Sequence, residues 1–309
     1  MTDSPYAIRN YQTADFDKYV LLCQEAEKLE PSRRPTSLQA ISESLGRPNY
    51  SPEQDLFVVE VAGSLIGYMD MVPELDIGRV ILDCWLYPEH RRKGLAAKLL
   101  GYAMQRAREV GAKVINVNIM ENNTVAKMVL SKLGFKCVRR FLEFRLDMSK
   151  LRWQETNQAA QECCYLKRGE EKKLTQIQNR AFAGTWGYNP NTVETITYRT
   201  HLSKFSPEDV VLTCDGDKVT GYCWTEETGA GEGRVYMLGV DPDYRDKGIG
   251  RRLLLAGLAH LKSKGVKVTV LTVDSENKAA YALYRSAGFE LWKRSLWYEK
   301  AITQAAGAS

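Results

Sequence analysis

The sequence predicts an α+β protein of two tandem domains, each with a mixed, partly parallel β-sheet flanked by helices. The main observation is an internal repeat, in which Gly94 and Asn123 recur 154 positions later as Gly248 and Asn277. The same ungapped offset relates Pro88 to Pro242, Gly111 to Gly265, Gly67-Tyr68 to Gly221-Tyr222 and Gly134-Phe135 to Gly288-Phe289. An offset this long indicates domain duplication, because solenoid repeats are only about 20–50 residues long. A second observation is that both halves show the same order of apolar strand-like runs, glycine turns and helical periodicity.

Composition limits the classes of function. The chain has 309 residues, 44% of them hydrophobic and 26% charged, which fits two globular domains. A net charge of +5 suits an anionic small ligand better than duplex nucleic acid, so no nucleic-acid partner is expected. No run of about 18 apolar residues occurs, and Met1–Pro5 shows no signal-peptide pattern, so we expect a cytoplasmic protein without a membrane partner. The sequence leaves the oligomeric state open.

Cysteine and histidine usage gives two further expectations. Seven scattered cysteines without a Cys-x-x-Cys motif indicate reduced thiols. The three histidines are far apart in the sequence, so no metal site is expected.

In the first copy, strands are predicted where apolar or alternating runs occur and helices where the apolar period is about 3.6. In order, these are a strand at Ala7–Asn10, a helix at Asp15–Leu29, a loop-rich excursion at Pro31–Pro52, strands at Leu56–Val61 and Leu65–Met71, a strand at Arg79–Leu86, a helix at Leu95–Val110, a strand at Val114–Ile119, a helix at Thr124–Leu133 and a last strand at Val138–Leu146. Gly63 marks the first hairpin turn, and Gly134 ends the helix at Thr124–Leu133.

The polar stretch Met148–Gln161 is the expected linker, and the second copy repeats the order. Its predicted elements are strand Cys163–Leu166, helix Glu170–Phe182, a variable stretch to Pro207, strands Val210–Cys214, Val219–Thr225 and Val235–Val240, helix Arg251–Lys264, strand Val268–Val273, helix Lys278–Ser286 and strand Leu291–Glu299. The expected domains are therefore residues 1–147 and 162–309, joined by residues 148–161.

The stretch from Val235 to Asp274 contains the most informative motif. An apolar strand ends at Asp241-Pro242, because proline cannot donate to the next ladder position. The glycine-rich turn Arg245–Gly250 follows and leads into a helix that Gly265 ends. Small residues let a phosphate approach the backbone, and the N–H groups of the first helical turn point at it. The stretch therefore predicts an anion-binding turn.

Two common phosphate-binding motifs do not fit this turn. A P-loop requires Lys-Ser/Thr after its second glycine, and a dinucleotide fingerprint requires G-x-G-x-x-G with a later acidic residue. The pattern R-x-x-G-x-G/A, with the downstream asparagine and the Gly-Phe pair in both copies, instead resembles the GNAT family of acetyl-CoA-dependent N-acetyltransferases. The second copy is most similar to mycothiol synthase-like acetyltransferases, although Arg234 stands where that group has an acidic residue.

The resemblance implies that acetyl-CoA binds along the strand before the turn and on the turn itself. The implied binding residues are Leu238, Gly239, Val240, Arg245, Asp246, Lys247, Gly248, Ile249, Gly250, Arg251 and Asn277. Gly239 is expected either to mark a bulge that parts its strand from Val268–Val273 or only to make room for a neighbour.

The resemblance also implies catalytic roles. Tyr284 would protonate the thiolate of coenzyme A, which suits a phenol with an ordinary pKa of about 10. The alternative is that Tyr284 is a core aromatic beside Phe289. The backbone N–H of Val240 would stabilise the oxyanion. Glu226 and Glu232 are the carboxylates best placed to act as general base, and a water chain is the alternative.

The first copy differs at two positions. Leu130 stands at the position equivalent to Tyr284 and cannot donate a proton, and the first turn ends in Ala96. A possible second cofactor site comprises Arg91, Arg92, Lys93, Gly94, Leu95, Ala96 and Asn123. We therefore expect an acetyl-CoA-dependent N-acetyltransferase whose C-terminal domain acetylates a small-molecule or peptide amine by direct attack. The alternative is a catalytically inactive acyl-CoA-binding or regulatory protein.

Overall fold

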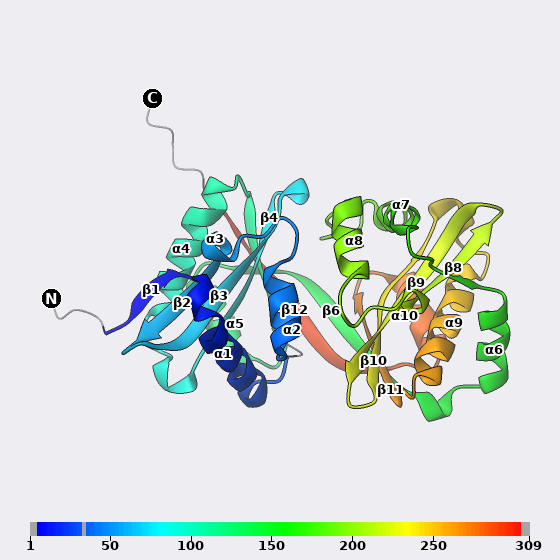
Figure 1. The fold of residues 1–309 in the computed structure, drawn as a ribbon, viewed down its shortest axis with the longest axis horizontal. Helices are drawn as coiled ribbons and strands as arrows, with labels where there is room; N and C mark the ends of the chain where they lie inside the picture. Colours follow the sequence, from blue (N-terminus) through cyan, green and yellow to red (C-terminus); the bar gives the residue numbers. More distant parts are fainter. Residues whose placement is uncertain (1–4, 33–34, 304–309) are drawn as a thin grey trace. The chain divides into compact units, whose positions relative to one another are not determined.

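The computed structural model describes residues 5–32 and 35–303, and the expectation about a leader at Met1–Ser4 lies outside this range. The chain forms two compact units (Figure 1). The N-terminal unit contains the described residues up to Val138 and from Trp297 onward, and the C-terminal unit contains Arg139–Leu296. The two units follow the two sequence repeats except at their last strands.

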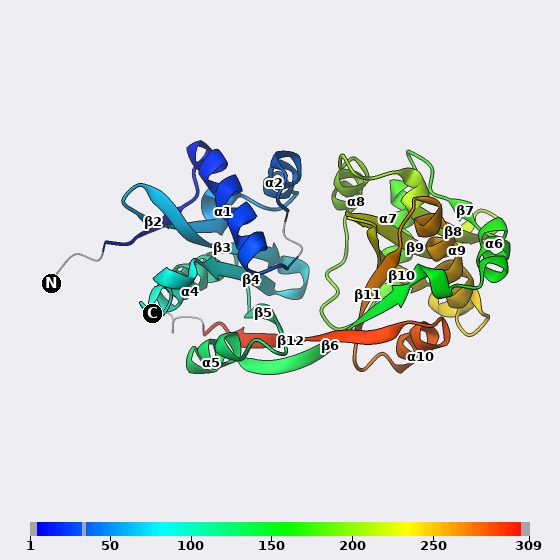
Figure 2. The same cartoon turned by 90° about the horizontal axis from the view of Figure 1, so that it is seen from below.

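The N-terminal unit is a mixed sheet with helices on both faces (Figure 2). Its elements are β1 (Ala7–Asn10), α1 (Phe16–Leu29), α2 (Leu38–Leu45), α3 (Pro52–Asp55), β2 (Leu56–Val61), β3 (Ser64–Glu74), β4 (Arg79–Leu86), α4 (Leu95–Glu109), β5 (Val114–Met120) and α5 (Thr124–Lys132). The strand order is β1-β2-β3-β4-β5, and only β4 and β5 run parallel. Helix α4 packs on one hydrophobic core, and α1 and α2 pack on a second core on the opposite face.

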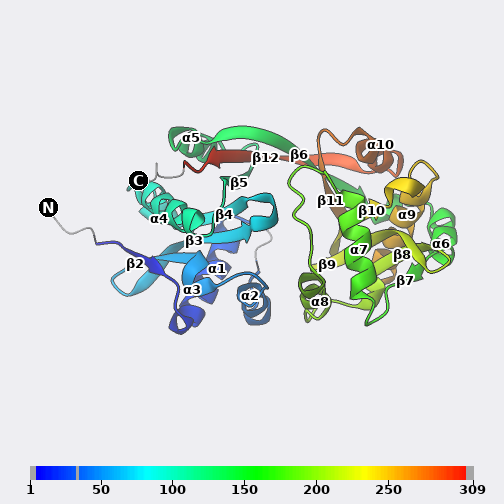
Figure 3. The same ribbon diagram turned by 90° about the horizontal axis from the view of Figure 1, so that it is seen from above.

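The C-terminal unit has the same layered arrangement (Figure 3). Its elements are β6 (Lys136–Asp147), α6 (Trp153–Gln161), β7 (Cys164–Tyr165), α7 (Glu171–Phe182), α8 (Val193–Thr200), β8 (Val210–Asp215), β9 (Lys218–Gly229), β10 (Glu232–Val240), α9 (Ile249–Ser263), β11 (Val268–Asp274), α10 (Lys278–Ser286) and β12 (Glu290–Ala301). Only the part of β6 from Arg139 onward and the part of β12 up to Leu296 belong to this unit. The strand order is β6-β11-β10-β9-β8-β7, with β10 and β11 parallel. Helices α6, α9 and α10 share one core, and α7 and α8 share the other.

The closing strands do not follow the expected domain boundary after residue 147. Strand β6 was expected to complete the first copy, but it pairs antiparallel with β11 of the C-terminal unit, from Val268↔Asp147 to Asp274↔Phe141. The end of β12 instead belongs to the N-terminal unit, where the amide of Asn116 donates to the carbonyl of Tyr298. Each repeat therefore supplies the last strand of the other unit.

The expected linker is also an ordered part of the C-terminal unit. Within residues 148–161, helix α6 packs against α9. Glu155 contacts Arg251 at 3.3 Å, and Glu162 contacts Arg252 at 2.8 Å, so the two helices are joined by charged pairs near the start of α9. Among the helices in residues 5–32 and 35–303, none is long and apolar enough to cross a membrane.

Candidate active site

Strands β10 and β11 separate part-way along their length. Their parallel pairing runs from Glu232↔Val268 to Val235↔Leu271 and then stops. At the same point the register between β10 and β9 shifts by one residue, so that Tyr236 is the bulged residue. The remainder of β10, up to Val240, keeps its bonds to β9 but has no strand partner on the β11 side within the described chain.

The free side of β10 presents backbone N–H groups. The Asp241 N–H donates to the Thr220 carbonyl of the β9 edge at 2.8 Å. Because N–H groups alternate in direction along a strand, those of Val240 and Leu238 point away from β9, toward the gap. This orientation is the one needed to bind an extended ligand as an additional strand.

The sequence left two roles open for Gly239, a bulge in the strand or room for a neighbouring side chain. The structure does not place the bulge at Gly239. A Cβ at this position would lie 2.7 Å from Tyr222 Cε1, 2.9 Å from Ala181 Cβ and 3.0 Å from Phe182 Cε2. The glycine therefore makes room for neighbours on the α7 face, and the bulge lies three residues earlier at Tyr236.

The turn after β10 is a concave run of backbone donors. Asp246 and Gly248 have positive φ values of 60° and 75°, and Gly248 is the N-cap of α9. The first helical N–H with an acceptor is that of Arg252, which donates to the Gly248 carbonyl at 3.1 Å. In the described chain, the N–H groups from Asp246 to Arg251 have no acceptor. Alternating backbone handedness and a helix N-terminus favour binding of an anion such as a pyrophosphate.

The basic side chains of the turn mainly brace it. Arg245 donates to the carbonyls of Ala181 at 2.8 Å and Val240 at 3.4 Å, so its guanidinium holds the turn against α7 and the strand end. Lys247 contacts the Asp243 carbonyl at 3.3 Å. Arg251 reaches Ser286 on α10 at 3.3 Å.

Helix α10 lies beside the start of α9. The Asn277 side chain caps α10 by accepting from the Ala280 N–H at 3.0 Å. A Cβ on Gly250 would contact Leu283 at 3.6 Å and Val240 at 3.7 Å, which places α10 next to both the turn and the strand end. Asn277 therefore has a visible structural role, and its side-chain N–H₂ has no acceptor among the described residues.

Tyr284 is buried on α10, with 7% of its surface exposed. Its ring lies edge-on to Phe289 at 6.0 Å between centroids and near Phe144 at 6.4 Å. Burial raises the pKa of Tyr284, and the nearby Cys223 adds to the rise. Cys223 is the cross-strand partner of Leu238 in the free part of β10, and it belongs to the same hydrophobic core as Tyr284. The Tyr284 hydroxyl has no hydrogen-bond partner in the part of the chain that the structure describes.

The two candidate bases have different surroundings. Glu226 on β9 is paired in register with Arg234 on β10, two residues before the bulged Tyr236. Arg234 binds only Oε2 of this carboxylate, with Nε at 2.7 Å, and Oε1 has no described partner. Glu232 begins β10, eight residues from Val240, or roughly 26 Å along an extended strand. Glu226 is thus the nearer carboxylate to the free edge.

An aromatic and cationic cluster beside the bulge was not predicted from the sequence. Tyr236 bonds to Arg199 of α8, packs on Trp224 at 5.5 Å and lies under the Arg234 guanidinium at 5.0 Å. Arg199 lies in the variable stretch, where no chemical pattern marks it.

The N-terminal unit repeats the turn but not the whole site. Gly94 has φ 77° and caps α4, and the N–H groups from Arg92 to Ala97 lack acceptors among the described residues. Arg91 binds the Leu86 carbonyl at 2.8 Å, as Arg245 does at the equivalent position. The β3–β4 pairing has no bulge, and Leu130 is buried where the second unit has Tyr284.

Comparisons with known proteins address the family and the fold. The model of the acetyltransferase (GNAT) family matches residues 19–135 and 172–289, once in each repeat. Mycothiol acetyltransferase of Stackebrandtia nassauensis is 26% identical over 289 residues, covering 89% of this chain and 94% of that protein. A GCN5-related N-acetyltransferase from Sphaerobacter thermophilus superposes with a TM-score of 0.72 at 22% identity, covering 98% of each chain. A tandem GNAT protein from the clavulanic acid biosynthesis pathway superposes with a TM-score of 0.71 at 15% identity, covering 97% of this chain and 99% of that one.

Proposed function

The chain belongs to the acetyltransferase (GNAT) family of enzymes, and from this premise we propose that its C-terminal unit transfers an acetyl group from acetyl-CoA to a primary amine by direct attack. One unit combines a free strand edge, a turn whose backbone N–H groups have no described acceptor, and a buried tyrosine on the neighbouring helix α10. This combination carries the proposal. The N-terminal unit has the first two features without the third.

The residues present fit acetyl-CoA. The N–H groups from Asp246 to Arg251 would hold the pyrophosphate, and those of Leu238 and Val240 would bond the amide-containing arm beside β10. When bound, acetyl-CoA supplies the activated thioester. The Val240 N–H lies on the side of the strand where it could stabilise negative charge developing on a carbonyl oxygen.

Proton transfer is assigned to two side chains. Burial keeps the Tyr284 hydroxyl protonated at neutral pH, so it can donate its proton to a departing thiolate. The attacking amine must lose a proton, and Oε1 of Glu226 is the available carboxylate oxygen nearest the bulge, directly or through one water. Glu232, farther along β10, is the weaker candidate.

The acceptor is proposed only as a primary amine on a small molecule or peptide. The relative from Stackebrandtia nassauensis is named a mycothiol acetyltransferase, which supports a small-molecule acceptor. Arg234 and its ion pair with Glu226 change the charge beside the bulge, so we do not extend the acceptor identity to this chain.

The N-terminal unit has part of the same site. Its turn retains free N–H groups at Gly94 and Leu95, while Leu130 offers no proton. We propose that this unit binds acyl-CoA without transferring the acyl group.

Release of free thiol from acetyl-CoA tests the enzymatic proposal. The full chain is incubated with acetyl-CoA and a panel of amines that includes amino sugars, polyamines and peptides. Amine-dependent thiol release supports the proposal. Tight coenzyme A binding with no turnover on any amine would leave the catalytically inactive alternative.

A further inference from the structure

We propose that Cys164 and Cys214 are a reversible oxidation site, at which a small organic disulfide converts the two thiols into an intramolecular disulfide bond. Both side chains are exposed, and their sulfur atoms are in contact at 3.7 Å. Exposure gives a small oxidant access to the thiols, and the contact lets the second thiol complete the bond. Neither cysteine takes part in the acetyl transfer proposed above.

The edge of the C-terminal sheet brings the two cysteines together. Strand β7 contains only Cys164 and Tyr165 and ends the strand order of the unit. Cys164 is opposite Leu212 of β8, and Cys214 lies two residues beyond Leu212 on the same strand. Because side chains alternate between the faces of a sheet, the two cysteines are diagonal neighbours on one face. The fold thus joins two thiols that are 50 residues apart in the sequence.

Bond formation requires only a local adjustment. A disulfide has an S–S distance of about 2.05 Å, so the two sulfur atoms must approach each other by roughly 1.7 Å. Strand β7 is short, and the register between β8 and β9 shifts between Thr213 and Cys214. Neither cysteine lies within a long regular ladder, so side-chain rotation with a small backbone shift can close the distance.

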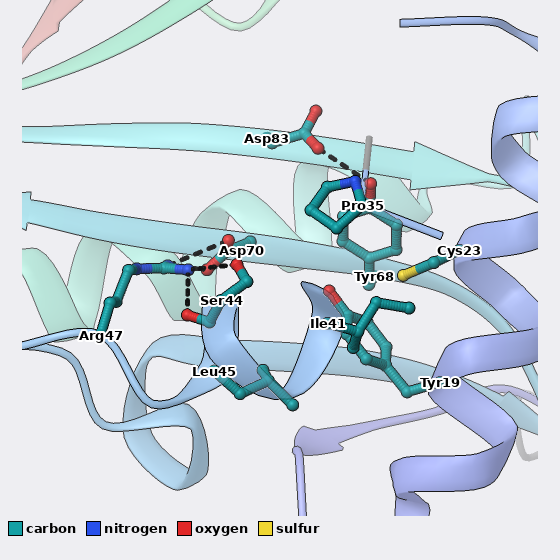
Figure 4. A pocket seen from close by; sticks show the side chains of 10 residues that line it. All are labelled: Tyr19, Cys23, Pro35, Ile41, Ser44, Leu45, Arg47, Tyr68, Asp70 and Asp83. Carbon is teal, nitrogen blue, oxygen red and sulfur yellow. Dashed lines mark hydrogen bonds and ion pairs between the residues drawn. The ribbon is translucent and has the colours of Figure 1, made fainter. Parts of the chain in front are cut away.

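Packing does not account for these two cysteines. Cysteines without a disulfide are usually buried and behave as small apolar residues. Cys23 fits this description, because it is buried in the same core as Tyr19 and Ile41 of the N-terminal unit (Figure 4). Cys164 and Cys214 are instead exposed, so their thiols are in contact with each other and accessible from solvent.

The thiol pair is specific to the second copy. The positions 154 residues earlier are Asn10 and Glu60. Glu60 binds the guanidinium of Arg9 at 2.7 Å, and Asn10 donates to the Gln54 carbonyl at 3.0 Å. The first copy therefore uses these positions for polar contacts, and the shared fold does not require cysteines there.

The surroundings of the two thiols give them different roles. Burial and the hydrogen bond with Cys164 raise the pKa of Cys214 to about 11, and Lys173 partly offsets this rise. Since the thiolate is the nucleophile, we assign the first attack to Cys164. Once Cys164 is in a mixed disulfide it carries no charge, so its contribution to the raised pKa of Cys214 disappears. The nearby ammonium of Lys173 then favours the Cys214 thiolate for the second attack.

The oxidation consists of two balanced exchange steps. The Cys164 thiolate attacks one sulfur of the small disulfide RS–SR and forms a mixed disulfide, and the released RS⁻ takes up the proton that Cys164 has lost. The Cys214 thiolate then attacks the Cys164 sulfur, and the second RS⁻ leaves and is protonated in the same way. Two protein thiols are oxidised to one disulfide, and the small disulfide is reduced to two thiols.

Disulfide mapping of the full chain tests the proposal. The chain is first reduced and freed of reductant, then treated at pH 8 with bis(2-hydroxyethyl) disulfide, and the remaining thiols are blocked with iodoacetamide. Digestion without reductant and mass spectrometry identify the joined peptides. The same treatment is applied to Cys164→Ser, Cys214→Ser and Cys163→Ser. Serine replaces an exposed thiol with a side chain of similar shape, so the first two variants are expected to keep the fold.

Cys163 is the matched control, because it precedes Cys164 and has almost the same sequence separation from Cys214. It is half-buried, and burial raises the pKa of its thiol to about 11. In an unfolded chain Cys163 and Cys164 would pair with Cys214 equally well, because the loops to be closed have nearly equal lengths. A preference for Cys164 therefore measures the folded arrangement.

The expected result is a link, within one chain, between the peptides that contain residues 164 and 214, with a combined mass lower by two hydrogen atoms. The yield should be unchanged in Cys163→Ser and fall at least about ten-fold in Cys164→Ser. In Cys214→Ser, Cys164 should remain as the mixed disulfide. Four outcomes would overturn the proposal: no link in the wild type, a link only between chains, loss of the link in Cys163→Ser, or an undiminished yield in Cys164→Ser.

Discussion

Arg234 binds Glu226 through one carboxylate oxygen only, which leaves the other oxygen of Glu226 beside the bulge at Tyr236. This arrangement lets a single acidic residue be both an ion-pair partner and a proton acceptor.

Glu226→Gln should lower kcat/KM at pH 7 by about a hundred-fold or more, because a general base contributes on this scale. The loss should shrink as the pH rises, since more of the amine is then neutral without help. Steady-state rates between pH 6 and pH 10 test this. Glu232→Gln is the matched control and should have little effect. If the pH–rate profile of Glu226→Gln stays parallel to that of the wild type, the result would instead favour a chain of water molecules as the proton acceptor.

Gly248→Val should weaken coenzyme A binding about ten-fold, because a side chain at φ 75° costs about 1–2 kcal/mol. Apart from chain neighbours, no atom of the described residues lies within 4 Å of a Cβ at Gly248 or Gly94, so the effect comes from the backbone and not from a clash. Gly94→Val is the matched change in the N-terminal unit. We expect two binding events in the wild type by calorimetry, one weakened by each variant. If Gly248→Val leaves both binding events intact, the turn at Gly248 is not the pyrophosphate site.

Gly239→Ala should destabilise the C-terminal unit by about 1–3 kcal/mol, the usual effect of overpacking. The new methyl group would lie within 3.0 Å of Tyr222, Ala181 and Phe182. Gly250→Ala is the control, since its Cβ would meet neighbours only at 3.6–3.7 Å. Urea unfolding of both variants provides the comparison, and equal stability would contradict the packing role assigned to Gly239.

The ionisation of Asp209 should make the free energy of unfolding depend on pH in the acid range. Burial opposes ionisation, but hydrogen bonds from His260 and Lys264 lower the pKa of this carboxyl below its ordinary value. Because the pKa of Asp209 is lower in the folded than in the unfolded state, its ionised form stabilises the fold above the unfolded pKa of about 3.9. This contribution is lost as the pH falls from there through the folded pKa. Asp209→Asn should therefore cost about 3 kcal/mol at pH 7 and less at pH 3, where part of this contribution has been lost. A difference in unfolding free energy that stays constant between these pH values would refute the assignment.

The repeat allowed much of the fold to be predicted. The turns at Gly94 and Gly248 are local features, and the capping asparagines Asn123 and Asn277 match helix starts in both units. Helix α9 extends from Ile249 to Ser263, close to the predicted Arg251–Lys264. Such elements depend on neighbouring residues, which a sequence displays directly.

The exchanged closing strands could not be predicted in this way. β6 and β12 come from equivalent positions of the two repeats, and their alternating patterns suit either sheet. Which sheet each strand joins depends on packing between distant residues, such as Phe144 with Tyr284. The contact between Arg199 and Tyr236 is equally non-local, because it joins a helix of the variable stretch to the bulge in β10.

The most direct test of acetyl transfer in the C-terminal unit is the kcat of Tyr284→Phe with acetyl-CoA and an accepted amine. Tyr281→Phe is the matched control, since Tyr281 lies on the same helix and is exposed. Loss of a general acid predicts a kcat lowered roughly 10²-fold or more in Tyr284→Phe, with coenzyme A affinity and the Tyr281→Phe rate unchanged. An unchanged kcat in Tyr284→Phe would show that Tyr284 is only a core aromatic residue and would contradict the proposed mechanism.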